Sequence, residues 1–140
     1  MTDNRKINIK ALVVGVLTDL GSSIVLGIIL GVVAAIILIA QGVPPKEVAV
    51  RLQGQMLLIP SMIIGLGGTL LGGFVAGRIA KDYEVFHGGI VGCISILLGF
   101  FFWSSCPLWY NLAGLIVTIP CGMLGGNIAK ITRKNINKNV

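Results

Sequence analysis

The chain has 140 residues, of which 55% are hydrophobic and 11% are charged, and its formal net charge is +6. Soluble domains carry about a quarter charged residues, so this composition excludes an ordinary soluble domain and indicates a lipid bilayer as the solvent. Four apolar segments of roughly the length that spans a membrane, with short connections, account for the whole chain. The basic residues lie at the ends of these segments, where lipid headgroups and membrane topology explain them, so no nucleic-acid partner is expected.

The first apolar segment, residues 11–40, follows a polar and basic beginning. It is far longer than the apolar core of about 7–15 residues in a signal peptide, so we expect it to remain as a membrane span. At about 1.5 Å per residue it exceeds a hydrocarbon core of about 30 Å, which predicts a tilted or projecting helix. Small and polar residues recur along it every four positions: Gly15, Asp19, Ser23, Gly27, Gly31 and Ala35.

A connection at residues 41–56 follows, with Pro44 and Pro45 at the point where one helix ends or the next begins. Residues 45–55 place Val48 and Leu52 on one side, which is typical of a short amphipathic helix on the membrane surface. A solvated loop is an equal alternative for this segment.

Three further spans are predicted at residues 57–80, 87–103 and 108–129. Trp103, Trp109 and Tyr110 flank the turn between the last two spans, as in an aromatic belt at one membrane interface. Pro120 inside the last span predicts a kink unless neighbouring helices relieve it. The tail after Lys130 is basic and rich in asparagine, and it is expected to fray.

A repeat relates the second span to the fourth. The stretch GLGGTLLGGFVAGRIAK at 65–81 returns without a gap as GLIVTIPCGMLGGNIAK at 114–130. Small residues one helical turn apart allow two helices to approach closely in a bilayer. Two matching stripes are therefore predicted to be helix-packing positions: Gly65, Thr69, Gly73 and Gly77, and Gly114, Thr118, Gly122 and Gly126.

The first and third spans match more weakly, through Val14-Gly15 and Val91-Gly92. The predicted fold is therefore all-α: one polytopic membrane domain, residues 1–140, with four transmembrane helices arranged as two parallel-repeated helical hairpins.

The distribution of Lys and Arg predicts the orientation. Two of the eleven basic residues, Lys46 and Arg51, lie on one side of the membrane. The positive-inside rule places the N and C termini on the other, cytoplasmic side. That side receives Arg5, Lys6, Lys10, Arg78, Lys81, Lys130, Arg133, Lys134 and Lys138.

Asp19 is a lone acidic residue within the first span, and an ionised carboxylate at that depth is costly. Thr18, Ser22 and Ser23 are near enough in sequence to hydrogen-bond it, so these four residues form a candidate intramembrane polar site. Two interpretations stay open. One is a proton or cation site inside the helix bundle, and the other is a structural hydrogen bond between helices.

The remaining polar residues suggest no catalytic chemistry. His87 is expected at an interface, paired with Asp82 or Glu84. The three cysteines have no CxxC spacing and no set of histidine partners, so no metal site is predicted. No motif of a hydrolase, metalloprotease or nucleotide-binding protein occurs, so no catalytic residue, enzyme activity or cofactor is predicted.

Several segments carry a resemblance to a known group of proteins: FHGGIVG at 86–92, PLWYN at 107–111, IPCGMLGGNIA at 119–129 and GGFVAGRIA at 72–80. They are similar to small, glycine-rich, four-span prokaryotic membrane proteins of unknown function. The resemblance implies the same fold and a multi-pass location in the inner (plasma) membrane of a prokaryote. It offers no functional residues.

The leading functional prediction is a non-enzymatic helix-packing protein or accessory subunit, whose partners are the lipid bilayer and either a second copy of itself or another membrane protein. An oligomeric channel or transporter using Asp19 is one alternative, and a holin-like permeabilising protein is another.

Overall fold

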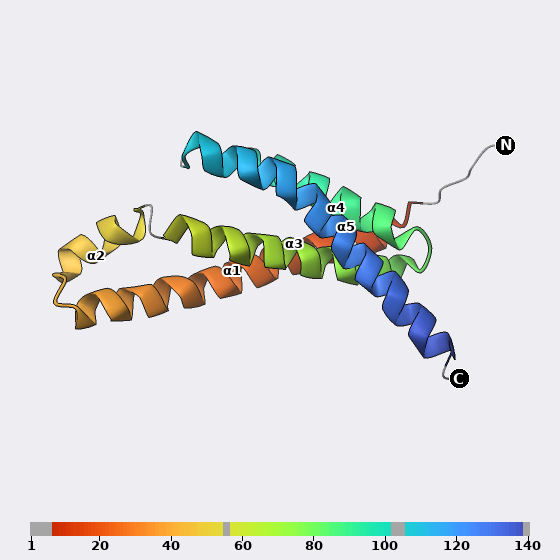
Figure 1. Ribbon diagram of the computed structural model, residues 1–140, viewed down its shortest axis with the longest axis horizontal. Coiled ribbons are helices and arrows are strands. Elements are labelled where there is room, and N and C mark those ends of the chain that lie inside the picture. Colours follow the sequence, from red (N-terminus) through yellow and green to blue (C-terminus); the bar gives the residue numbers. More distant parts are fainter. Residues whose placement is uncertain (1–6, 55–56, 102–105, 139–140) are drawn as a thin grey trace.

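The computed structural model describes residues 7–54, 57–101 and 106–138, and within them the chain forms five helices and no strand (Figure 1). The all-α prediction is confirmed. The helices in chain order are α1 (Ile9–Ala40), α2 (Pro45–Leu52), α3 (Leu58–Ala80), α4 (Glu84–Gly99) and α5 (Leu108–Lys138).

Three of these helices, not four, are long and apolar enough to cross a membrane: α1, α3 and α5. The third predicted span, 87–103, is represented by α4, which has 16 residues and rises about 24 Å, less than a hydrocarbon core of about 30 Å. It begins three residues early, after Tyr83 turns the chain in a left-handed conformation with φ 52°. The predicted end at Trp103 lies outside the described residues.

The long helices alternate in direction. In Figure 1, α1 and α4 run away from the end of the molecule that holds the start of α1, the end of α5 and the α3–α4 turn, and α3 and α5 run back toward it. We call this the basic end, because these segments contain most of the lysines and arginines. The opposite end, where α2 joins α1 to α3, is the α2 end.

The second helix is short and mostly exposed. Helix α2 begins at the proline pair. Pro44 is the N-cap and Pro45 is the first helical residue, where a missing amide donor costs little. Val48 is 7% exposed and α2 packs against α1. The segment predicted at 45–55 is thus helical through Leu52, and residues 55 and 56 lie outside the described residues.

The prediction that the tail after Lys130 frays was wrong, because α5 continues beyond this residue. It continues as one helix through Pro120 and on to Lys138. Contacts with neighbouring helices extend into this region: Ala129 is 1% exposed, and Nη2 of Arg133 lies 2.8 Å from Oε1 of Glu84 on α4. These contacts attach the polar C-terminal part of α5 to the other helices, which its sequence alone does not predict.

The expected partner of His87 was also wrong. The imidazole is 2% exposed, and its Nε2 accepts a hydrogen bond of 3.1 Å from the backbone N–H of Asn8, at the N-cap of α1. Its Nδ1 lies 3.1 Å from the carbonyl oxygen of Tyr83. A neutral ring with the proton on Nδ1 satisfies both contacts. His87 therefore joins the start of α4 to the start of α1, and Glu84 pairs with Arg133 instead.

Glycines bring the helices into backbone contact in the half of the molecule nearest the basic end. A Cβ atom on Gly72 of α3 would lie 2.6 Å from the carbonyl oxygen of Gly15 on α1. A Cβ on Gly73 would collide with the carbonyl of Gly122 on α5, and so would a Cβ on Gly88 of α4. Since only glycine fits these positions, α3 packs directly between α1 and α5, with α4 covering both α3 and α5.

The half nearest the α2 end is open. A Cβ added at any of eight glycines in it would meet no atom within 4 Å: Gly21, Gly27, Gly31, Gly42, Gly65, Gly67, Gly99 and Gly114. Figure 1 shows the corresponding arrangement, with the α1–α3 pair diverging from the α4–α5 pair toward the α2 end. The helix pairs begin to diverge near Asp19, whose side chain contacts those of Thr69 and Ser95.

Candidate functional site

Asp19 lies at the level where the two helical hairpins begin to separate. It is ten residues from the start of α1, and Thr69 and Ser95 are each eleven residues from the basic ends of α3 and α4. At the helical rise these separations are about 15–17 Å, which is half of a hydrocarbon core of about 30 Å. Three helices therefore place polar side chains at the same level, about 15–17 Å from the basic end.

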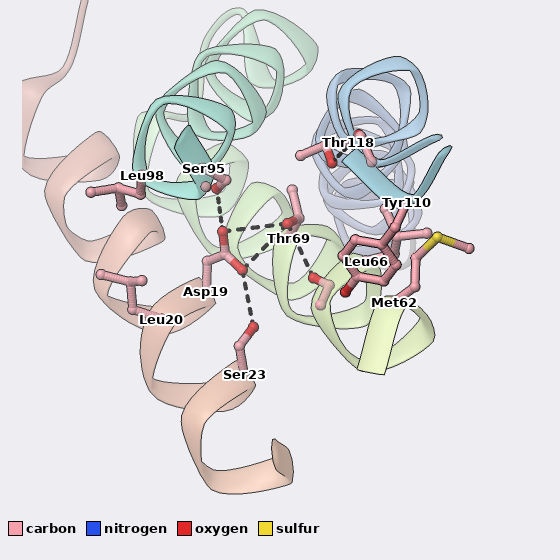
Figure 2. A pocket seen from close by; sticks show the side chains of 13 residues that line it. Asp19, Leu20, Ser23, Met62, Leu66, Thr69, Ser95, Leu98, Tyr110 and Thr118 are labelled. Carbon is pink, nitrogen blue, oxygen red and sulfur yellow. Dashed lines mark hydrogen bonds between the residues drawn. The ribbon is translucent and has the colours of Figure 1, made fainter. Parts of the chain in front are cut away.

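The Asp19 carboxyl group is surrounded by hydroxyl groups (Figure 2). Its Oδ1 lies 3.5 Å from the hydroxyl of Ser23 and 3.4 Å from that of Thr69. Its Oδ2 lies 3.4 Å from the Thr69 hydroxyl and is also hydrogen-bonded to Ser95. The side chain is 6% exposed, so these contacts replace water around a group that would otherwise be poorly solvated.

Two of the three hydroxyls have a second acceptor. Thr69 Oγ1 lies 3.2 Å from the carbonyl oxygen of Gly65, and Ser95 Oγ lies 2.9 Å from that of Val91. A hydroxyl has one proton to donate, so each must donate either to Asp19 or to its own helix. An ionised Asp19 receives both protons. A protonated Asp19 can donate to Ser95, which then donates to Val91. The cluster thus has a complete hydrogen-bond arrangement for each protonation state.

The structure divides the polar set that the sequence suggested. Ser23 reaches the carboxyl group, whereas Ser22 donates to the backbone carbonyl of Asp19 at 3.1 Å and Thr18 donates to that of Val14 at 2.8 Å. Thr69, predicted only as a packing residue, joins Asp19 from α3. Ser95 was missed, although it is the single serine or threonine in α4 and is the residue that the weak repeat aligns with Thr18.

A cavity of about 390 Å³ opens beside this cluster. Its walls are largely apolar, with Leu20 and Leu98 on one side of Asp19 and Met62, Leu66 and Tyr110 on the other, as Figure 2 shows. A second hollow of about 290 Å³ shares Ser95, Gly99, Tyr110, Gly114 and Thr118 with it and extends to Asn111. The volume and the apolar wall with a few polar groups are typical of small-molecule sites.

The two repeated stripes have different environments along their length. The members nearest the basic end lie at helix–helix contacts: Gly73 approaches Gly122, and a Cβ on Gly77 would lie 3.2 Å from Cα of Gly126. The members nearest the α2 end line the cavity instead: Gly65, Thr69, Gly114 and Thr118. Because Gly65 and Gly114 have no side chain, they leave the space that the cavity occupies.

Other chemistry is sparse within the described ranges. They contain no group of three or more His, Cys, Asp or Glu side chains arranged to hold a metal ion. Cys93, Cys106 and Cys121 are free thiols, and the Sγ of Cys121 lies 3.3 Å from the carbonyl oxygen of Leu66.

Comparisons of the chain with protein-family models, curated proteins and solved structures found no match. The function is therefore argued from the cavity itself.

Proposed function

We propose that this chain is a non-enzymatic integral membrane protein that binds a small cationic solute at Asp19 and exchanges it for a proton. The observation that carries the proposal is the Asp19 carboxyl group, which is contacted by hydroxyls from α1, α3 and α4 and borders a cavity of about 390 Å³. This corresponds to the transporter alternative from the sequence.

The exchange follows from the cost of charge in a membrane. An isolated ionised carboxylate near the bilayer centre is disfavoured by a few kcal/mol on insertion scales. Asp19 is electrically neutral when it holds a proton and also when it pairs with a bound cation, and the ionised empty state is the costly one. Arrival of a cation therefore favours departure of the proton, and the hydroxyls of Thr69 and Ser95 turn from their backbone carbonyls to the carboxylate.

The cavity wall indicates the kind of cation. Most of its lining is apolar and includes the ring of Tyr110, so it would accommodate a hydrocarbon or aromatic body. A protonated amine can donate to the Asp19 carboxylate and also interact with an aromatic face. We therefore infer a small amine with an apolar body as the solute class, in preference to a hydrated metal ion.

The membrane arrangement that accompanies this function is four spans in two parallel hairpins, in the inner membrane of a prokaryote. A helix extended from the start of α4 at Glu84 to the predicted end at 103 would have 20 residues, which matches the length of a span. The positive-inside rule supports placing the basic end in the cytoplasm. The cavity would then lie on the outer side of the glycine contacts.

Binding of benzylammonium to the purified protein in detergent tests the proposal, with benzyl alcohol as the neutral probe of similar shape. We expect the wild type to bind benzylammonium more tightly than benzyl alcohol. Asp19→Asn should weaken benzylammonium binding about tenfold or more, because it removes a charged acceptor, while the amide keeps hydrogen-bonding capacity that helps the fold. Asp82→Asn, at the exposed α3–α4 turn, is the matched control and should bind normally. Equal binding by wild type and Asp19→Asn would leave Asp19 a structural role alone.

A second candidate is the accessory or self-associating subunit. It is favoured by the α2-end half of α1, where a Cβ added at Gly27 or Gly31 would meet no atom within 4 Å and Ile28 and Ile36 are exposed. Gly27→Leu should leave a monomer unchanged and should weaken an assembly that packs on this face. Light scattering of the purified protein distinguishes the two results.

A further inference from the structure

Another pocket, which shares no lining residue with the Asp19 cavity, lies at the basic end where α3, α4 and α5 meet. It has a volume of about 310 Å³, and its lining includes three basic side chains and one acidic side chain. The basic residues are Arg78 and Lys81 from the end of α3 and Arg133 from α5, and the acidic residue is Glu84 from the start of α4. Its formal charge is therefore positive, although the pocket contains a carboxylate.

Within the part of the chain that the structure describes, one of the three cations forms an ion pair with a carboxylate. Arg133 forms an ion pair with Glu84, whose side chain is 5% exposed, at 2.8 Å between Nη2 and Oε1. The angles of this contact do not make it a hydrogen bond, so Oε1 of Glu84 is held by charge alone. Among the described residues, neither Arg78 nor Lys81 forms an ion pair with a carboxylate.

Local structure positions Arg78 by a side-chain contact and Lys81 by its backbone conformation. The guanidinium carbon of Arg78 lies 5.8 Å from the centre of the Phe74 ring, a cation–π arrangement on the same helix. Lys81 ends α3 in a left-handed conformation with φ 63°, and its N–H bonds to the carbonyl of Gly77. Gly77, which packs against Gly126, lies at the inner edge of the pocket between the two basic side chains and α5.

We propose that this pocket binds the phosphate of an anionic phospholipid headgroup. Arginine and lysine are the side chains that bind phosphate, and basic pockets between helix ends at a membrane surface bind anionic headgroups. Ala129 and Ile136 provide an apolar border on α5 that suits a lipid better than a fully hydrated anion. The proposal depends on embedding in a membrane and not on the function of Asp19.

Native mass spectrometry with phosphatidylglycerol, phosphatidylcholine or inorganic phosphate as the added probe tests this site on the full chain. We expect selective retention of phosphatidylglycerol by the wild type. The double variant Arg78→Gln/Lys81→Gln should weaken that retention about 30-fold, since each basic residue near an anionic headgroup contributes a factor of about five. The double variant Lys46→Gln/Arg51→Gln, which removes the same charge at the α2 end, should retain the lipid like the wild type.

A third variant gives a change of the opposite sign. Glu84→Gln removes the acid that competes with a phosphate for Arg133, so it should strengthen the retention of phosphatidylglycerol. Unchanged or weaker retention would contradict the role of Arg133 in the pocket. If both double variants lost retention of phosphatidylglycerol equally, the net charge of the protein would explain the effect, and the proposed site would be overturned. Binding of inorganic phosphate as tight as that of phosphatidylglycerol would overturn the lipid assignment.

Discussion

Gly73→Ala tests how closely the helices pack near the basic end. The added Cβ would lie 3.1 Å from both Cα and the carbonyl carbon of Gly122, and closer still to its oxygen. These are backbone atoms, so α3 and α5 must separate by about 1 Å to restore ordinary contact with the oxygen. Adding a methyl group to a packed core costs about 1–3 kcal/mol, and the better helix propensity of alanine returns up to about 1 kcal/mol. We expect a net loss of about 1–2 kcal/mol in the free energy of unfolding.

The control is Gly67→Ala on the same helix, where the new Cβ would meet no atom within 4 Å. It keeps the propensity gain without the collision, so the free energy of unfolding should stay level or rise by up to about 1 kcal/mol. Unfolding both variants with sodium dodecyl sulfate from mild detergent micelles, followed by circular dichroism, measures the difference. Equal effects of the two substitutions, or a more stable Gly73→Ala, would refute close α3–α5 packing at this point.

Three other predictions concern the remaining contacts. His87→Ala removes the acceptor for the partly buried Asn8 N–H and should destabilise the protein by about 1–3 kcal/mol in the same unfolding assay; an unchanged free energy of unfolding would show that this hydrogen bond does not join α1 to α4. Gly114→Leu should fill the cavity, preserving the unfolding transition but abolishing benzylammonium binding, and undiminished binding would place the probe elsewhere. Alkaline phosphatase fused after Gln53 should be active outside the cytoplasm and inactive when fused after Val140, and the reverse pattern would invert the topology.

Much of the fold was accessible from the sequence because membrane helices obey a simple length and composition rule. Apolar segments separated by Pro44-Pro45 and by the polar turn at Asp82 predict helices, and the structure has helices in these segments. The four-residue spacing also selected Gly73 and Gly122, which the structure brings into contact. Such patterns are local to one helix, so a single sequence displays them directly.

Contacts between helices were harder to predict because they depend on relative rotation and depth. Asp19 was recognised as unusual for its charge, but the spacing along α1 could not show that Thr69 and Ser95 approach from other helices. His87 was assigned to the carboxylates nearest in sequence, whereas its partner Asn8 is 79 positions away. For the same reason the pairing of Arg133 with Glu84, which anchors the C-terminal part of α5, was not anticipated.

The division of each stripe into a packing part and a cavity part has a similar origin. Gly65 and Gly73 have the same residue type and the same spacing in the repeat, yet one borders open space and the other touches a backbone. The difference arises from the divergence of the two hairpins, which is a property of the assembled bundle. The change in the free energy of unfolding caused by an alanine at each position would measure this difference.

The number of protons released when benzylammonium binds is the most direct test of exchange at Asp19. The measurement uses weakly buffered detergent solution and a pH-sensitive dye, at a pH where the free probe remains charged. We predict release of up to one proton for each benzylammonium bound by the wild type, and no release from Asp19→Asn. Tight binding without proton release at any pH, or the same release from Asp19→Asn, would contradict proton–cation exchange at this carboxyl group.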